Sequence, residues 1–101
     1  FALATRYEGH GMVLDEAMAR GLPVVSCATG AVPDTLAAGA GLLVPPDDPE
    51  AFAGALAQLL DDAPGRARTA AAAAAAGALL PTWRQTARRV AAMLEELSRE
   101  R

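Results

Sequence analysis

The chain has 101 residues, of which 52% are hydrophobic, and its formal net charge is -3. This length fits one domain or part of one, because single domains typically contain on the order of 100 to 200 residues. All nine basic residues are arginines, and they form no stripe that would follow a phosphate backbone. The composition therefore argues against two complete domains and against nucleic acid as a partner.

The cysteine content and the length of the apolar runs indicate where in the cell the protein is expected. Cys27 is the only cysteine, so no internal disulfide is possible. Short secreted chains usually carry several cysteines, so we expect a cytoplasmic location. The small-residue run over 70–80 is much shorter than the roughly 20 residues that a membrane span needs, so we expect no transmembrane segment. Because the sequence opens inside an apolar stretch at Phe1, we interpret it as a fragment of a longer protein.

Short apolar segments alternate with segments of helical period, which is typical of βαβ units and a parallel sheet. Strands are expected over 1–4, 24–27 and 42–44, each ended by a turn signal. The predicted fold class is therefore α/β.

Helices are expected between and after these strands. A helix over 12–20 ends at Gly21, and a short helix capped by Asp34 ends at Gly39. The first of these helices is expected to bury an apolar face made of Val13, Leu14, Ala17 and Met18.

Alanine-rich helices are expected at the C-terminal end. Asp48 and Pro49 predict the N-cap and first position of a helix that ends near 61–65, with one apolar face formed by Phe52, Leu56, Leu59 and Leu60. Residues 66–80 favour helix over disorder, but the pattern leaves their burial open. Thr82 and Gln85 predict a capping box for a last helix, whose apolar seam contains Trp83, Ala87, Val90, Leu94 and Leu97.

The segment most informative about function joins the first strand to the first helix. Residues 7–12 read Tyr-Glu-Gly-His-Gly-Met. Gly9 and Gly11 allow the backbone to approach a ligand closely, and the free N–H groups of Met12 and Val13 at the helix start favour an anion. Two glycines also suit any tight turn between a strand and a helix, so a purely structural turn remains an alternative.

Two carboxylates flank this turn. Glu8 precedes the glycines, and Glu16 lies eight positions later on the helix. Helical angles place Glu16 away from the apolar face, where its carboxylate could accept hydrogen bonds from the two vicinal hydroxyls of a ribose. The alternative is a solvent-exposed glutamate paired with Arg20 four residues later.

The sequence resembles retaining GT-B glycosyltransferases of family four. Residues 7–12 and 15–25 resemble the family's motif of two glutamates separated by seven residues. Residues 29–34 resemble its glycine-rich loop, 41–49 its strand and proline turn, and 80–83 the entry to its last helix. The resemblance covers nearly all of the chain.

The resemblance implies a fold and an activity. It implies two Rossmann-like domains facing each other across a cleft, with residues 1–101 in a three-layer part of the C-terminal, nucleotide-sugar-binding domain and the N-terminal acceptor domain outside this chain. It implies transfer of a sugar from a nucleotide-diphosphate donor to an acceptor with retention of anomeric configuration. An Arg and Lys pair that neutralises the diphosphate lies upstream in the family. No cofactor and no metal are expected.

The resemblance also assigns roles to residues. Glu8 is the catalytic residue, near the hydroxyls of the transferred sugar, and Glu16 holds the ribose. The donor sugar and phosphates contact Gly9, His10, Gly11, Met12 and Val13. The sequence departs from the family's pattern at His10, Asp15 and Ala31. His10 either donates to the ligand or packs as the family's aromatic residue does, and a lone histidine makes no metal site.

Two alternative functions remain open at this stage. A nucleotide-sugar epimerase or a phosphorylase would share the GT-B fold. A different class is an interaction module, in which the seam of the last helix pairs with a second copy or, as the family implies, with the N-terminal domain. Self-association of the isolated chain is a possible consequence of that seam.

Overall fold

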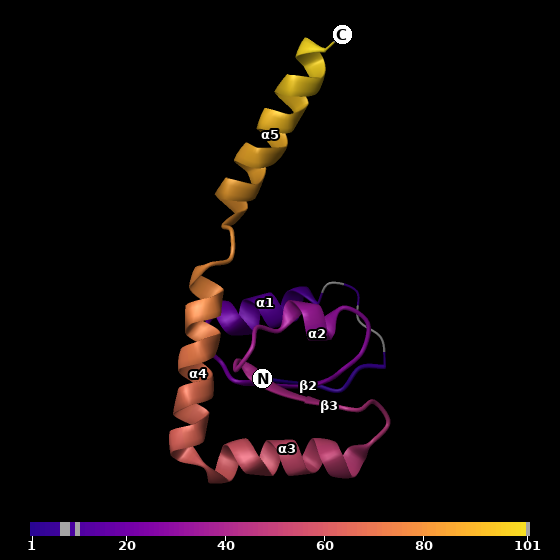
Figure 1. The fold of residues 1–101 in the computed structure, drawn as a ribbon, viewed down its shortest axis with the longest axis vertical. Helices are drawn as coiled ribbons and strands as arrows, with labels where there is room; N and C mark the ends of the chain where they lie inside the picture. Colours follow the sequence, from indigo (N-terminus) through magenta and orange to yellow (C-terminus); the bar gives the residue numbers. More distant parts are fainter. Residues whose placement is uncertain (7–8, 10, 101) are drawn as a thin grey trace.

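The computed structural model describes residues 1–6, 9 and 11–100 (Figure 1). Its strands are β1 (Ala2–Leu3), β2 (Val24–Cys27) and β3 (Gly41–Val44). They form one sheet in the order β1-β2-β3, and both strand pairs are parallel. The predicted α/β class with a parallel sheet is confirmed, and β1 is shorter than expected.

The described residues form five helices, and four of them, α1 to α4, pack around the sheet. α1 (Met12–Ala19) connects β1 to β2, and α2 (Val32–Thr35) connects β2 to β3. α3 (Pro49–Asp61), α4 (Ala63–Ala78) and α5 (Trp83–Arg99) follow β3. Figure 1 shows α1 and α2 on one face of the sheet and α3 on the other, with α4 running along one side of these three layers.

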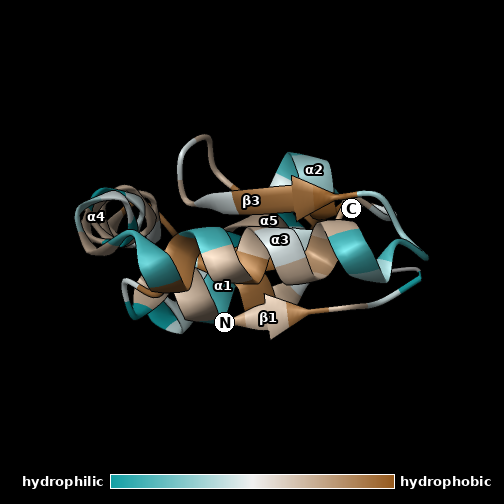
Figure 2. Ribbon diagram, turned by 90° about the horizontal axis from the view of Figure 1, so that it is seen from below, coloured by the Kyte–Doolittle hydropathy of each residue, from teal (hydrophilic) through white to brown (hydrophobic). Residues whose placement is uncertain are grey.

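The central strand β2 divides the core into two halves, because alternate side chains of a strand point to opposite faces. Val24 belongs to the cluster formed with α1, α2 and α4. Val25 and Cys27 belong to the cluster formed with β3 and α3, and Figure 2 shows the apolar strands behind the turns of α3. Cys27 is buried and free, as the strand assignment implies.

The alanine-rich segment is a helix that packs closely on α1. Ala73 is fully buried, and a Cβ added at Gly77 would overlap the carbonyl of Met18. The helix begins at Ala63, earlier than expected, because the Asp62 side chain accepts a hydrogen bond from the N–H of Gly65 at 2.9 Å. The helix that starts at Pro49 ends at Asp61, within the predicted 61–65, and the single residue Asp62 joins α3 to α4.

Three further predictions need correction. Val13 is 39% exposed and Leu60 is 70% exposed, because each lies about 100° around its helix from its neighbour in the predicted face, the buried Leu14 and the half-buried Leu59. Asp34 lies inside α2 rather than at its N-cap, which is Ala31. Pro33 fits the first turn of this helix, where its missing N–H costs nothing.

Helix α5 extends away from the rest of the molecule (Figure 1). The predicted capping box is present, since Thr82 Oγ1 accepts from the N–H of Gln85 at 3.1 Å and Gln85 Oε1 accepts from the N–H of Thr82 at 2.8 Å. None of the described residues of α5 is buried, and its predicted seam is exposed, for example at Trp83 and Leu94. Among the described helices, none combines the length and the apolar character that crossing a membrane requires.

Candidate functional site

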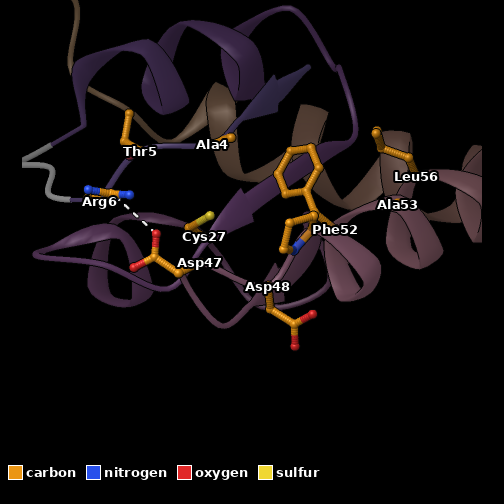
Figure 3. A pocket seen from close by; sticks show the side chains of 10 residues that line it. Ala4, Thr5, Arg6, Cys27, Asp47, Asp48, Phe52, Ala53 and Leu56 are labelled. Atoms are coloured by element: carbon orange, nitrogen blue, oxygen red, sulfur yellow. Dashed lines mark hydrogen bonds and ion pairs between the residues drawn. The ribbon is translucent and has the colours of Figure 1, made fainter.

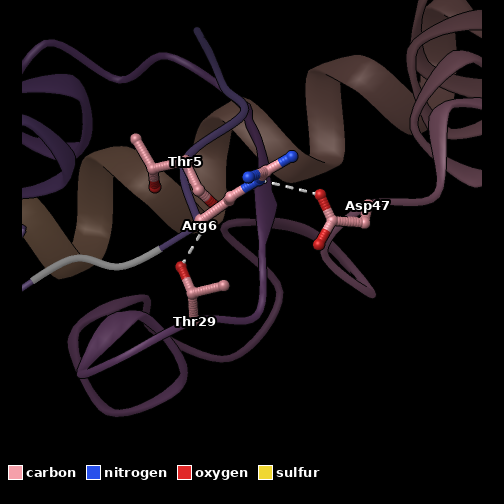
Figure 4. A network of polar contacts seen from close by, with 4 residues as sticks. All are labelled: Thr5, Arg6, Thr29 and Asp47. Carbon is pink, nitrogen blue, oxygen red and sulfur yellow. Dashed lines mark hydrogen bonds and ion pairs between the residues drawn. The ribbon is translucent and has the colours of Figure 1, made fainter.

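The carboxyl ends of the parallel strands meet at one edge of the sheet, where ligands bind in open α/β folds. Thr29, which follows β2, donates a hydrogen bond from Oγ1 to the carbonyl oxygen of Thr5 at 3.4 Å. Arg6, which follows β1, donates from Nε to Oδ1 of Asp47, which follows β3, at 3.0 Å. Figure 4 shows these contacts side by side, so side chains and backbone link the three strand ends.

Helix α1 begins near this edge with a glycine that the backbone requires. Gly11 is the N-cap, with φ 78 and ψ 54, in the left-handed region that side-chain-bearing residues rarely adopt. Gly11 provides no side-chain cap to the first turn. Met12 is 57% exposed, so the helix start is open to solvent. The N–H groups of the first turn and the helix dipole give this end partial positive charge, as an anion site needs.

Glu16 lies on the open side of α1, as its helical angle predicts. It is exposed and lines a groove of about 300 Å³ together with Met12 and Trp83. No salt bridge joins Glu16 to Arg20, although both are described residues of the same helical face. The alternative role of Glu16 as one half of a helical ion pair therefore has no support in this geometry.

The predicted site residues divide into two groups. Gly9, Gly11, Met12, Val13 and Glu16 are described, and the last four share α1 or its cap. A Cβ added at Gly9 would meet no atom within 4 Å, so no described neighbour requires a glycine there. The remaining two predicted residues, Glu8 and His10, lie outside the described residues.

The ion pair between Arg6 and Asp47 was not anticipated from the sequence. Its side chains are 86% and 65% exposed, and a surface pair of this kind typically contributes at most about 1 kcal/mol. Asp47 also has a φ of 59, in the left-handed region that Asp and Asn adopt more readily than other residues with a side chain. The exposed pair therefore contributes little to stability. The one feature of the sequence that could have indicated this pair is that each residue lies shortly after a strand.

A cavity of about 440 Å³ lies beside this ion pair. Its apolar floor includes Phe52 and Leu56 from α3, and Cys27 lies at the end of β2 (Figure 3). Arg6 and Asp47 form part of its rim. In residues 1–6, 9 and 11–100, no group of three or more His, Cys, Asp or Glu side chains could hold a metal ion.

The parallel sheet with helices on both faces defines a Rossmann-like α/β domain. Residues 1–76 match the family described as glycosyl transferases group 1, and the chain belongs to this family of GT-B, family-4-like glycosyltransferases. The resemblance inferred from the sequence motifs is thereby confirmed at the level of the family.

Relatives and a solved structure agree with this assignment. The chain is 36% identical to a lipopolysaccharide core biosynthesis mannosyltransferase of Rhizobium meliloti, over 98% of the chain and 29% of that protein. It is 44% identical to a D-inositol 3-phosphate glycosyltransferase of Stackebrandtia nassauensis, over 79% of the chain and 18% of that protein. Sucrose-phosphate synthase from Thermosynechococcus elongatus superposes with a TM-score of 0.88 at 30% identity, over 99% of the chain and 25% of that structure. The chain thus spans less than a third of each of these proteins.

Proposed function

We propose that the protein containing this chain transfers a sugar from a nucleotide-diphosphate donor to an acceptor with retention of anomeric configuration, and that this chain binds the donor. The observation that carries the proposal is the position of α1. It begins with the left-handed Gly11 near the ligand-binding edge of the sheet and carries an exposed glutamate, Glu16, on its open side. Family membership and the names of the relatives, which are glycosyltransferases, support the same activity.

The proposed roles follow from the chemistry of the donor. The diphosphate is anionic, and the N–H groups of Met12 and Val13 supply hydrogen-bond donors at the positive end of a helix dipole. Glu16 accepts hydrogen bonds from the ribose hydroxyls. In the proposal, Glu8 acts at the transferred sugar as the catalytic residue, and Gly9, His10 and Gly11 contact that sugar.

The proposal also covers the parts that other segments supply. This chain would form the second half of the donor-binding domain, and a separate N-terminal domain would bind the acceptor. A basic pair outside the chain would neutralise the leaving diphosphate, so no metal or other cofactor is needed. The proposed location is the cytoplasm.

Turnover by the whole protein tests the proposal. UDP-sugars and GDP-sugars are supplied with candidate acceptors, nucleoside diphosphate release is measured, and the anomeric configuration of the product is read by NMR. We expect turnover with retention, and a loss on the order of a hundredfold in Glu8→Gln, since positioned acids and bases contribute roughly that much. Glu50→Gln, an exposed glutamate in the first turn of α3, is the control.

Three outcomes would contradict the proposal. Inversion at the anomeric carbon would refute retention. Equal rates in Glu8→Gln and Glu50→Gln would remove the catalytic role of Glu8. Conversion of the nucleotide sugar to its 2-epimer without any acceptor would support an epimerase instead.

A further inference from the structure

Arg6 stands apart from the other described arginines by its position. It lies three residues after the end of β1, at the carboxyl edge of the sheet, whereas the others lie within or next to helices: Arg20, Arg66, Arg68, Arg84, Arg88, Arg89 and Arg99. The chain has no lysine. Within the described residues, Arg6 is therefore the cation that the fold holds beside the carboxyl ends of all three strands (Figure 4).

Arg6 is held in place without being buried. Its Nε donates to Asp47 Oδ1 at 3.0 Å, and its side chain is 86% exposed. The cavity of about 440 Å³ lies on its α3 side (Figure 3), and the high exposure of the side chain leaves the guanidinium open to a ligand from solvent. A weak, solvent-exposed pair exchanges its carboxylate for another anion at little cost.

The turn after β3 places the carboxylate of Asp47 beside Arg6. The φ of Asp47 is 59, in the left-handed region that aspartate tolerates better than most residues with a side chain. The carboxylate of Asp47 therefore reaches Arg6 across the end of β2, although the two residues are 41 positions apart in the sequence. The contact with Asp47 uses the Nε edge of the guanidinium. The two Nη groups remain as donors for a second anion, such as a carboxylate or a phosphate group.

We propose that Arg6 binds a phosphate group of the nucleotide donor, and that Asp47 positions Arg6 in the free protein and competes with that phosphate. This inference rests on the proposed function. It adds Arg6 as a cation that this chain contributes to the donor site, and Asp47 as a residue that limits donor affinity. Gly11 starts α1 five residues after Arg6, a span of at most about 18 Å. Both positions belong to the carboxyl edge of the sheet, where ligands bind in open α/β folds. Charge developing on the leaving diphosphate would be stabilised by the guanidinium.

Calorimetric measurement of UDP and GDP binding to the whole protein tests this proposal. The test uses two substitutions that are expected to change the affinity in opposite directions. Arg6→Gln should weaken binding of the nucleoside diphosphate by roughly tenfold, as expected for loss of a charge-assisted hydrogen bond. Asp47→Asn should strengthen it severalfold, because it removes the competing charge and because asparagine tolerates the left-handed backbone. Arg6→Lys should retain part of the affinity. Arg68→Gln, on α4, is the matched control and should have no effect.

The results distinguish a failure of the role proposed for Arg6 from a failure of the proposed function. Affinity for uridine and guanosine, which carry no phosphate, should be unchanged in Arg6→Gln, and melting temperatures should stay close to that of the parent protein. If Arg6→Gln and Asp47→Asn both leave affinity unchanged or both lower it, the pair is only a structural clamp and the inference is wrong. If Glu16→Gln weakens UDP or GDP binding while Arg6→Gln does not, the proposed function survives and the role of Arg6 fails. If the parent protein binds neither nucleotide, both fail together.

Discussion

At the scale of single residues, Glu16 most clearly separates a functional role from a structural one. It is exposed, it forms no salt bridge with Arg20, and it lines a groove between α1 and the start of α5. A carboxylate that supports no packing and pairs with no helical neighbour contributes little to folding. A role in ligand binding should therefore change binding and leave stability nearly constant.

We predict that Glu16→Gln in the whole protein weakens nucleoside diphosphate binding by about tenfold or more. The substitution keeps size and helix propensity but removes hydrogen bonds to a charged acceptor, which contribute roughly 1.5 to 3 kcal/mol. Calorimetric titration and a melting curve on the same variant provide the measurement. Glu50→Gln on α3 is the control, and unchanged affinity in Glu16→Gln would refute the ribose assignment.

Cys27 supplies a prediction about burial. It is 6% exposed and packs with Val25 and Val44 between the sheet and α3. We expect a thiol reagent to modify Cys27 in the native protein on the order of a hundredfold more slowly than in denaturant, because reaction requires local opening. Peptide mapping by mass spectrometry follows this residue specifically, and equal rates in the two conditions would contradict the packing around β2.

At the scale of elements, the contact between α1 and α4 depends on a glycine. Alanine normally stabilises a helix relative to glycine by about 1 kcal/mol. At Gly77 the added Cβ would overlap the Met18 carbonyl and the Ala19 Cα, so the two helices would have to separate. We predict that Gly77→Ala destabilises the protein by roughly 1 to 3 kcal/mol, as overpacking usually does.

Gly54 in α3 is the matched control for this prediction, because a Cβ there would meet no atom within 4 Å. Gly54→Ala should stabilise the protein by roughly 0.5 to 1 kcal/mol. Urea denaturation of both variants measures the difference. Stabilisation by Gly77→Ala would show that α1 and α4 do not pack as described.

The exposed seam of α5 predicts association. Val90, Leu94 and Leu97 are exposed at 46%, 61% and 60%, and contiguous apolar stripes of this kind tend to be covered. We expect the isolated 101-residue chain to associate as its concentration rises, which light scattering after size exclusion measures. Leu94→Glu should reduce association, whereas Ala92→Glu, outside the seam, should not. Equal association of both variants would exclude the seam as the interface.

The elements that the sequence predicted best are those governed by local chemistry. The bounds of β2, the Asp48 cap and the capping box of α5 follow from side chains that act within a few residues. Errors arose where burial depends on a distant partner: the exposure of Val13 is set by which face of α1 meets the rest of the core. The same reason explains why the burial of the alanine-rich helix could not be predicted.

The candidate site was partly predictable for the same reasons. Gly11 and Glu16 could be identified because strand, turn and helix follow one another in the sequence. The contact of Arg6 with Asp47 could not, because it joins residues 41 positions apart and depends on the order of the strands. Periodicity carries no information on that order.

At the scale of the whole molecule, the chain contains only part of what the proposed reaction needs. An acceptor site and a basic pair at the diphosphate would come from other segments of the protein, as the family resemblance implies. We predict that the 101-residue chain alone does not transfer sugar, because it cannot position both substrates. Turnover by the purified chain, lost in Glu8→Ala, would contradict this division of roles.

The central claim is that the nucleotide donor binds at the carboxyl edge of the sheet beside the start of α1. A crystal structure of the whole protein with bound nucleoside diphosphate tests it most directly. The account predicts phosphate oxygens about 2.7 to 3.2 Å from the N–H nitrogens of Met12 and Val13, and the ribose hydroxyls on Glu16. A nucleotide bound away from this edge, for example in the groove beside Gln58 and Arg68 between α3 and α4, would contradict it.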